Sequence, residues 1–271
     1  MDVIRIQDLT RDYGGGKGVF GLTFSVGQGE AFGFLGPNGA GKTTTIRHLM
    51  GFIRPKAGSC SVGVYDCWTK SAEIQRTLGY IPGEIAFFDD MTGVEHLKFI
   101  AKYRGEHSEN RKNQLLDRFE LDPKGKIKKM SKGMKQKIGI VAAFMHDPDV
   151  LILDEPTSGL DPLMQNRFVE LIAEERERGK TILMSSHMFE EVERTCHRIG
   201  IIRSGRLVAV DTVDALRERH MRTYTVTLPD EKTAADFAAD FRGTADGRNV
   251  TVAASMSLED VFMQYYSKEG K

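Results

Sequence analysis

Short apolar runs alternate with segments of helical character along most of the chain. Ala31–Leu35 and Val150–Leu153 are compact apolar runs, typical of strands that are buried on both faces of a parallel sheet. Thr43–Met50 contains neither Gly nor Pro and suits a helix, and Leu163–Arg178 has the pattern of a charged helix. Strands that alternate with helices predict an α/β fold with a largely parallel sheet. Further strands are predicted at Val3–Leu9, Leu22–Val26, Thr181–Ser185, Ile199–Ile202 and Arg206–Val210, and helices at Ser131–Met145 and Met188–His197.

Two parts of the chain depart from this alternation. Between Met91 and Lys129, two segments combine helical spacing with dense charge, which indicates a separate helical subdomain at about residues 86–135. After residue 220 a small α+β appendage is expected, so we divide the chain into a domain of residues 1–220 and an appendage of residues 221–271. The predicted elements are helices at Glu95–Tyr103 and Arg111–Glu120 in the subdomain, and strands at Thr223–Leu228 and Asn249–Ala253, an amphipathic segment at Lys232–Phe241 and a helix from Ser257 to Tyr266 in the appendage.

Composition narrows the class of protein. Of the 271 residues, 40% are hydrophobic, which is enough for a sizeable core. Lys and Arg number 38, as do Asp and Glu, so the net charge is zero and no global field favours nucleic acid. The three cysteines form no CxxC pair, which fits a reducing compartment. No run approaches the roughly 20 apolar residues that span a bilayer. We expect a cytoplasmic protein that reaches the inner face of the membrane through a partner.

A glycine-rich loop connects the strand Ala31–Leu35 to the helix after it. The loop fits the pattern G-x-x-x-x-G-K-[ST], in which glycines let backbone N–H groups surround phosphate oxygens. Lys42 is expected to reach the β- and γ-phosphates, and the Thr43 hydroxyl to hold Mg²⁺. A glycine turn without nucleotide is the alternative, and the flanking strand and helix argue against it. The residues assigned to the nucleotide are Gly36, Pro37, Asn38, Gly39, Ala40, Gly41, Lys42, Thr43 and Thr44.

Two consecutive acids follow the apolar strand Val150–Leu153. The carboxyl end of a buried strand is where α/β sheets bind ligands, so Asp154 and Glu155 are expected at the site of the loop. Asp154 would complete the magnesium shell, and Glu155 would poise a water for attack on the γ-phosphate. Alternatively, paired acids simply cap the next helix or turn. The phosphate loop makes the catalytic interpretation the better one.

The order of the remaining motifs resembles that of the ABC-type ATPases over about residues 2–220. Met130–Lys137 stands at the place of the family's LSGGQ signature, and Leu153–Asp161 closely matches its acidic strand and D-loop. His187 matches the switch histidine, and Tyr13 stands where the family has an aromatic that stacks on adenine. The resemblance implies a P-loop NTPase core of RecA-like type, with an antiparallel β subdomain and the helical subdomain that carries the signature.

The resemblance also implies that two cassettes hold two Mg·ATP between them, each signature facing the phosphate of the opposing nucleotide. His187 would hold the γ-phosphate. Without the resemblance, Ser131 is a helix N-cap, His187 an ordinary strand-end histidine and Tyr13 an ordinary aromatic. The signature and D-loop residues assigned to the nucleotide are Ser131, Lys132, Gly133, Met134 and Asp161.

The sequence departs from the family pattern at two places. Gly83 replaces a glutamine that contacts magnesium, and either Glu84 or water takes over that role. Lys132 and Met134 replace a glycine and the glutamine of the signature; the lysine adds positive charge near a phosphate, but also bulk. With Asp89–Gly93 and the closing helix, these changes resemble bacterial exporter ATPases with separate ABC-2-type membrane subunits, which serve drug, antibiotic, lipid or peptide export.

Together these features predict the ATP-hydrolysing motor subunit of a transporter. ATP and Mg²⁺ are the expected ligands, and a second cassette and integral membrane subunits are the expected partners, with no nucleic acid. A soluble ABC ATPase of translation or DNA maintenance is one alternative, and the single cassette without a basic stripe counts against it. An ATP-sensing cassette with little turnover is another, kept open by Gly83.

Overall fold

The computed structural model describes residues 1–88, 90–104, 109–219 and 222–254, together with 259 and 263. The chain forms two compact units, Met1–Val210 and Asp211–Lys271. The boundary predicted from the sequence lies after residue 220, because the pattern did not reveal the short helix α8 (Val213–Arg219) and its residues were assigned to the first domain.

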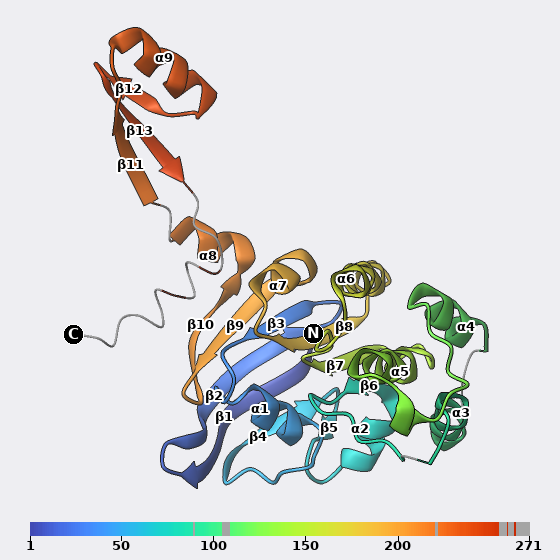
Figure 1. Ribbon diagram of the computed structural model, residues 1–271. Helices are drawn as coiled ribbons and strands as arrows, with labels where there is room; N and C mark the ends of the chain where they lie inside the picture. Colours follow the sequence, from blue (N-terminus) through green and yellow to red (C-terminus); the bar gives the residue numbers. More distant parts are fainter. Residues whose placement is uncertain (89, 105–108, 220–221, 255–258, 260–262, 264–271) are drawn as a thin grey trace. The chain divides into compact units, whose positions relative to one another are not determined.

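The larger unit is built on a six-stranded sheet with the order β10-β9-β3-β8-β7-β6 (Figure 1). At its centre, β3 (Ala31–Leu35), β8 (Thr181–Ser186) and β7 (Val150–Asp154) pair in parallel. Nearly every residue of these strands is buried. Burial on both faces is the reason that they are apolar without alternation. The outer strands are β6 (Leu78–Ile81), β9 (Arg198–Arg203) and β10 (Arg206–Thr212).

A four-stranded sheet with the order β2-β1-β4-β5 is the predicted antiparallel β subdomain. The two sheets share one core, in which the rings of Phe24 and Phe32 stack with centroids 5.2 Å apart. The sequence pattern did not predict β4 and β5, because small and polar residues such as those of AGSCSV obscure the alternation of a strand. The strands are β1 (Asp2–Gly14), β2 (Lys17–Gly27), β4 (Ala57–Val62) and β5 (Tyr65–Asp66).

Helices cover the sheets and form the helical subdomain. Of these, α7 packs closely on β3. The close approach is seen at Gly33, where a Cβ would collide with the side chain of Val192. The first helix of the subdomain, α3, begins with a capping box in which Thr92 and Glu95 bond each other's backbone N–H. The helices of this unit are α1 (Lys42–Leu49), α2 (Ser71–Thr77), α3 (Gly93–Arg104), α4 (Glu109–Arg118), α5 (Lys132–Phe144), α6 (Pro162–Glu177) and α7 (Phe189–Thr195).

The smaller unit contains α8 and a three-stranded antiparallel sheet, in which β13 (Asn249–Ala254) lies between β11 (Arg222–Thr227) and β12 (Thr244–Asp246). Asp230 caps α9 (Glu231–Asp240) by accepting from the Thr233 N–H at 2.8 Å. The sequence pattern predicted all of these elements except α8 and β12. The predicted helix that ends at Tyr266 lies outside the described residues.

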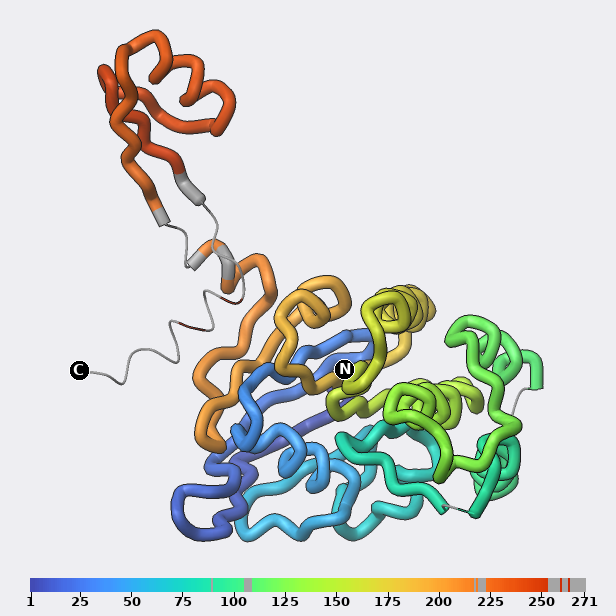
Figure 2. The backbone as a smooth tube through the Cα atoms, in the orientation of Figure 1, coloured from blue at the N-terminus to red at the C-terminus, as the bar shows by residue number. Residues whose placement is uncertain are grey.

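Parts that are far apart in the sequence meet in the central sheet (Figure 2). Leu35 at the end of β3 is in register with Ser186 of β8, and Ser185 with Asp154 of β7. Ile81 of β6 is in register with Leu153. Because these strands are parallel, their carboxyl ends share one edge. The segments after these four strands therefore meet at this edge.

Candidate nucleotide-binding and hydrolysis site

The phosphate loop leaves β3 at Gly36 and enters α1 at Lys42. Gly41, the residue before the helix, has a φ of 113°, which a residue with a side chain rarely adopts. The Lys42 side chain is only 4% exposed. Its ammonium folds back over the loop and donates to the carbonyls of Gly36 at 2.7 Å and Pro37 at 3.2 Å. The loop is thus held in a curl with a cation and a helix N-terminus on the same side, which suits a polyphosphate.

Glu155 contacts both Lys42 of the phosphate loop and His187, the predicted switch histidine. One carboxylate oxygen lies 3.2 Å from Lys42 Nζ, and the other lies 2.9 Å from His187 Nδ1. The backbone of Glu155 has a φ of 47°, which costs roughly 1 kcal/mol for a residue with a side chain. Its N–H donates to the Ser185 carbonyl and hydroxyl, both at 3.1 Å, which holds the strained turn in place. The three predicted catalytic residues are therefore linked by direct contacts, from Lys42 to Glu155 and from Glu155 to His187.

Asp154 is fully buried at the end of β7. Its Oδ1 accepts a hydrogen bond from the Ser185 hydroxyl, whereas Oδ2 has no hydrogen-bond partner among the described residues. A Cβ built on Gly83 would lie 3.0 Å from this free oxygen and 3.9 Å from Thr43 Oγ1. A carboxylate oxygen and a hydroxyl therefore face the same small space beside Gly83.

The charge of Asp154 affects the pKa of a neighbouring side chain. Burial, and secondly the Asp154 charge, raise the pKa of the Tyr80 hydroxyl to about 12. Among the described residues no group of three or more His, Cys, Asp and Glu side chains is placed to hold a metal. Magnesium needs no such cage, since it is usually bound by one or two carboxylates, waters and substrate phosphates. The oxygens of Asp154 and Thr43 fit this cation.

The magnesium requirement of the ATPase distinguishes a water in the space beside Gly83 from direct ligation by Glu84. Replacing Gly83 by Ala is expected to raise the Mg²⁺ concentration for half-maximal ATPase activity severalfold, because the methyl group would lie 3.0 Å from Asp154 Oδ2. Glu84 is exposed, and Glu84→Ala serves as the control with an unchanged requirement. A larger effect of Glu84→Ala in a magnesium titration would make Glu84 the ligand instead.

The signature forms the start of α5. Ser131 is its N-cap, and the hydroxyl accepts from the Met134 N–H at 3.2 Å. Lys132 Nζ donates to the Ser158 hydroxyl at 3.0 Å, and a Cβ at Gly133 would lie 2.8 Å from the Gly159 carbonyl oxygen. The bulk that Lys132 adds thus packs along the D-loop of the same chain. Sequence reasoning had no means of finding this contact.

The other predicted nucleotide contacts lie on separate elements. Tyr13 is half exposed near the end of β1, with the Arg11 guanidinium 5.5 Å from the centre of its ring. Asp161 caps α6 by accepting from the Met164 N–H at 3.0 Å. Both have structural contacts of their own, and a role towards nucleotide stays a prediction for each.

A groove of about 170 Å³, here called the hydrolysis groove, opens beside the predicted catalytic residues Glu155 and His187. Its walls include Glu155, His187 and the D-loop residues Thr157, Ser158 and Gly159. A strand, a phosphate loop and a helix, with an acidic strand end beside the loop, define a P-loop nucleoside triphosphatase.

The comparisons with known proteins narrow this class. Residues 19–158 match the family model described as ABC transporter. The chain is 37% identical over 271 residues to the linearmycin resistance ATP-binding protein LnrL of Bacillus subtilis (strain 168), covering 98% of this chain and 87% of that protein. It is 39% identical over 237 residues to the bacitracin transport ATP-binding protein BcrA of Bacillus licheniformis, covering 86% and 77%. The chain belongs to the ABC transporter family.

Solved structures of ABC transporter cassettes are similar to this chain. The ATP-binding subunit of an ABC transporter superposes with a TM-score of 0.73 at 34% identity, covering 80% of this chain and 92% of that chain. A dimeric bacterial ABC transporter cassette matches with a TM-score of 0.69 at 22% identity, covering 78% and 98%, which supports the fold. The chain is the ATP-hydrolysing subunit of an ABC transporter. Within the described residues, no helix is both long and apolar enough to cross a membrane.

Proposed function

We propose that this ATPase drives export of a drug, antibiotic, peptide or lipid through a separate membrane subunit, at the cytoplasmic face of the membrane. The observation that carries the proposal is the length of the similarity, since the match to the linearmycin resistance protein covers 98% of this chain. The likeness therefore extends past the cassette into the smaller unit. Two further relatives are named for bacitracin transport and Nod factor export.

In this proposal the phosphates lie on the loop Gly36–Thr43, with Mg²⁺ held by Thr43 and Asp154. When bound there, the cation would supply positive charge against the charge that develops on the phosphate oxygens. Glu155 orients the attacking water, and His187 holds the γ-phosphate. Since Lys42 and Glu155 are in contact at 3.2 Å, a phosphate that attracts the ammonium also frees the Glu155 carboxylate for the water.

The opposing nucleotide would be bound by the signature of a second cassette. Ser131 and Lys132 are exposed at the N-terminus of α5, where a hydroxyl, backbone N–H groups and a helix dipole meet. If two chains complete each site, ATPase activity rises faster than linearly with protein concentration.

Co-purification tests the proposal. The tagged chain, expressed in its native cells and extracted in mild detergent, is expected to retain a multi-span membrane protein, and its ATPase activity to follow that complex. Recovery with ribosomes or DNA instead would favour a soluble ABC ATPase. A chain that binds ATP but releases no phosphate at any concentration, even with the membrane protein added, would be an ATP sensor.

A further inference from the structure

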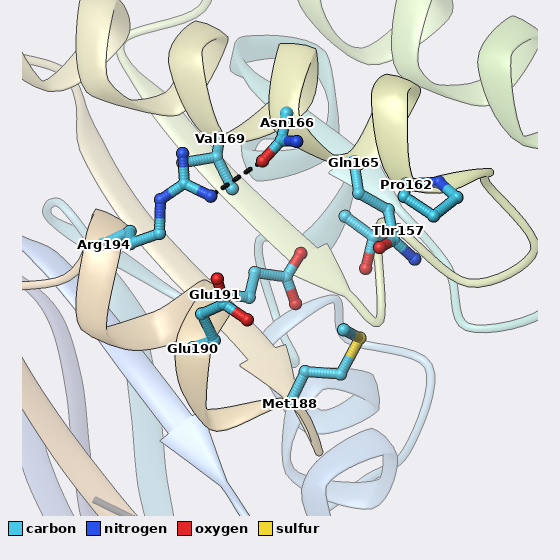
Figure 3. Close-up of a pocket in the computed structure, with 9 residues that line it drawn as sticks. All are labelled: Thr157, Pro162, Gln165, Asn166, Val169, Met188, Glu190, Glu191 and Arg194. Atoms are coloured by element: carbon cyan, nitrogen blue, oxygen red, sulfur yellow. Dashed lines mark hydrogen bonds between the residues drawn. The ribbon is translucent and has the colours of Figure 1, made fainter. Parts of the chain in front are cut away.

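A cavity of about 160 Å³ lies next to the hydrolysis groove, between α6 and α7 (Figure 3). Three residues, Thr157, Gln165 and Met188, line both the cavity and the groove that contains Glu155 and His187. Figure 3 shows the hydrogen bond from Arg194 to Asn166, which joins α7 to α6 at 2.8 Å. Thr157, Gln165 and Met188 therefore connect this cavity to the wall of the groove that contains Glu155 and His187.

Glu191 is the buried acid of this cavity. Its side chain comes from the first turn of α7 and is 5% exposed. One carboxyl oxygen accepts from the Ser186 hydroxyl at 2.6 Å, and the Thr157 hydroxyl also interacts with the carboxyl. Oε1 has no partner of normal hydrogen-bond geometry within the described part of the chain. A buried carboxyl is expensive unless hydrogen bonds satisfy it, so its two hydroxyl neighbours matter.

The Ser186 hydroxyl connects Glu191 to the residue that follows His187. Its oxygen accepts from the Met188 N–H at 2.9 Å, which closes a tight turn with His187 at its middle. The Met188 carbonyl is a second acceptor within reach of the hydroxyl, at 3.4 Å, but Glu191 is much closer at 2.6 Å. A hydroxyl proton directed at Glu191 leaves the lone pairs of the oxygen for the Met188 N–H. Glu191 thus orients the hydrogen bond that shapes the turn of His187.

Charges on several elements face the Glu191 carboxyl. Burial raises its pKa, and the charge of Glu155 acts in the same direction. The hydroxyls of Ser186 and Thr157 and the imidazole of His187 oppose that rise. The hydroxyl of Ser186 donates to Oε2 of Glu191, so the need at this position is for a hydrogen-bond acceptor.

We infer that Glu191 is a positioning residue for ATP hydrolysis, which holds the turn of His187 against the D-loop residue Thr157. The turn determines where the imidazole lies relative to Glu155, and these two side chains are 2.9 Å apart. A loss of this support is expected to displace His187, which follows β8, and to leave the phosphate loop, which follows the neighbouring strand β3, in place. Positional errors of about 1 Å at such sites cost up to about 100-fold in rate.

The chain offers a matched control in Glu190. Both acids lie in the first turn of α7, so both are near the positive end of the helix dipole. Glu190 is exposed, and Glu191 alone bonds Ser186. A difference between the two positions therefore reports the contact with Ser186 rather than the helix end.

The test compares Glu191→Ala, Glu191→Gln and Glu190→Ala in steady-state ATPase assays, with nucleotide affinity from a fluorescent ATP analogue and Tm by calorimetry. Glu191→Ala is expected to lower kcat about tenfold and to leave KM and nucleotide affinity within about twofold. Glu191→Gln keeps an acceptor and is expected to retain more than half of kcat. Glu190→Ala behaves like the wild type.

Several results would overturn the inference. A kcat for Glu191→Ala equal to that of Glu190→Ala does so, as does a glutamine variant that is as slow as the alanine variant. If Glu191→Ala does not fold, Ser186→Ala removes the donor instead and is expected to lower kcat similarly, with unchanged nucleotide affinity. Where Glu191→Ala folds, combining it with Ser186→Ala should add no further loss, because both changes break one hydrogen bond. Full additivity, or an unaffected Ser186→Ala, refutes the coupling.

Discussion

Replacing Glu155 by Gln is expected to lower ATP turnover by about 10²–10⁴-fold while ATP still binds. The amide has the size of the carboxylate and the same backbone requirements at a φ of 47°, so the turn at the end of β7 persists. It cannot take up a proton from the attacking water. The loss of negative charge near the γ-phosphate also favours bound ATP, so the variant should accumulate as an ATP-bound dimer.

Phosphate release under single-turnover conditions measures this effect, and light scattering with and without ATP measures the dimer. Glu190→Gln makes the same chemical change at an exposed position and controls for charge alone. A hydrolysis rate of Glu155→Gln equal to the wild type would remove Glu155 from the catalytic residues. Wild-type activity that rises faster than linearly with concentration, beside a nearly inactive variant, supports the two-cassette site.

Replacing Asp154 by Asn is expected to lower the rate of magnesium-dependent hydrolysis by about 10²-fold or more. In the wild type, Oδ1 accepts from Ser185 and Oδ2 faces the space beside Gly83 and Thr43. In the variant, the amide oxygen takes the Ser185 bond and the NH₂ group faces that space. A donor at this place repels a cation and removes the charge that attracts it.

This variant also has a stability signature that does not depend on turnover. Asp154 Oδ2 is buried with no hydrogen-bond partner among the described residues, which penalises the charged side chain. Without divalent cations, Asp154→Asn is therefore expected to melt at the wild-type Tm or above it. Saturating Mg²⁺ with ATP should raise the wild-type Tm more than that of the variant. An equal rise in both proteins would place the metal elsewhere.

Local patterns in the sequence determined much of this protein. The buried strands β3 and β7, the loop Gly36–Thr43 and the acids after Leu153 are each encoded within a few neighbouring residues, so periodicity and spacing revealed them. The order of strands and helices then predicted the parallel sheet, because only parallel strands bring those loops to one edge. The N-cap role of Ser131, which the sequence offered as the alternative to a nucleotide contact, is present in the structure, since capping depends on the next few residues alone.

Only the tertiary structure decided which side chains meet across the sheet. The pairing of Asp154 with Ser185, of Lys132 with Ser158 and of Glu191 with Ser186 depends on register, on side-chain direction and on how closely α7 approaches β3. Sequence periodicity reports which face a residue occupies, not which distant residue it contacts. The short strands β4 and β5 were missed for the same reason, because pairing with β1, rather than their own composition, makes them strands.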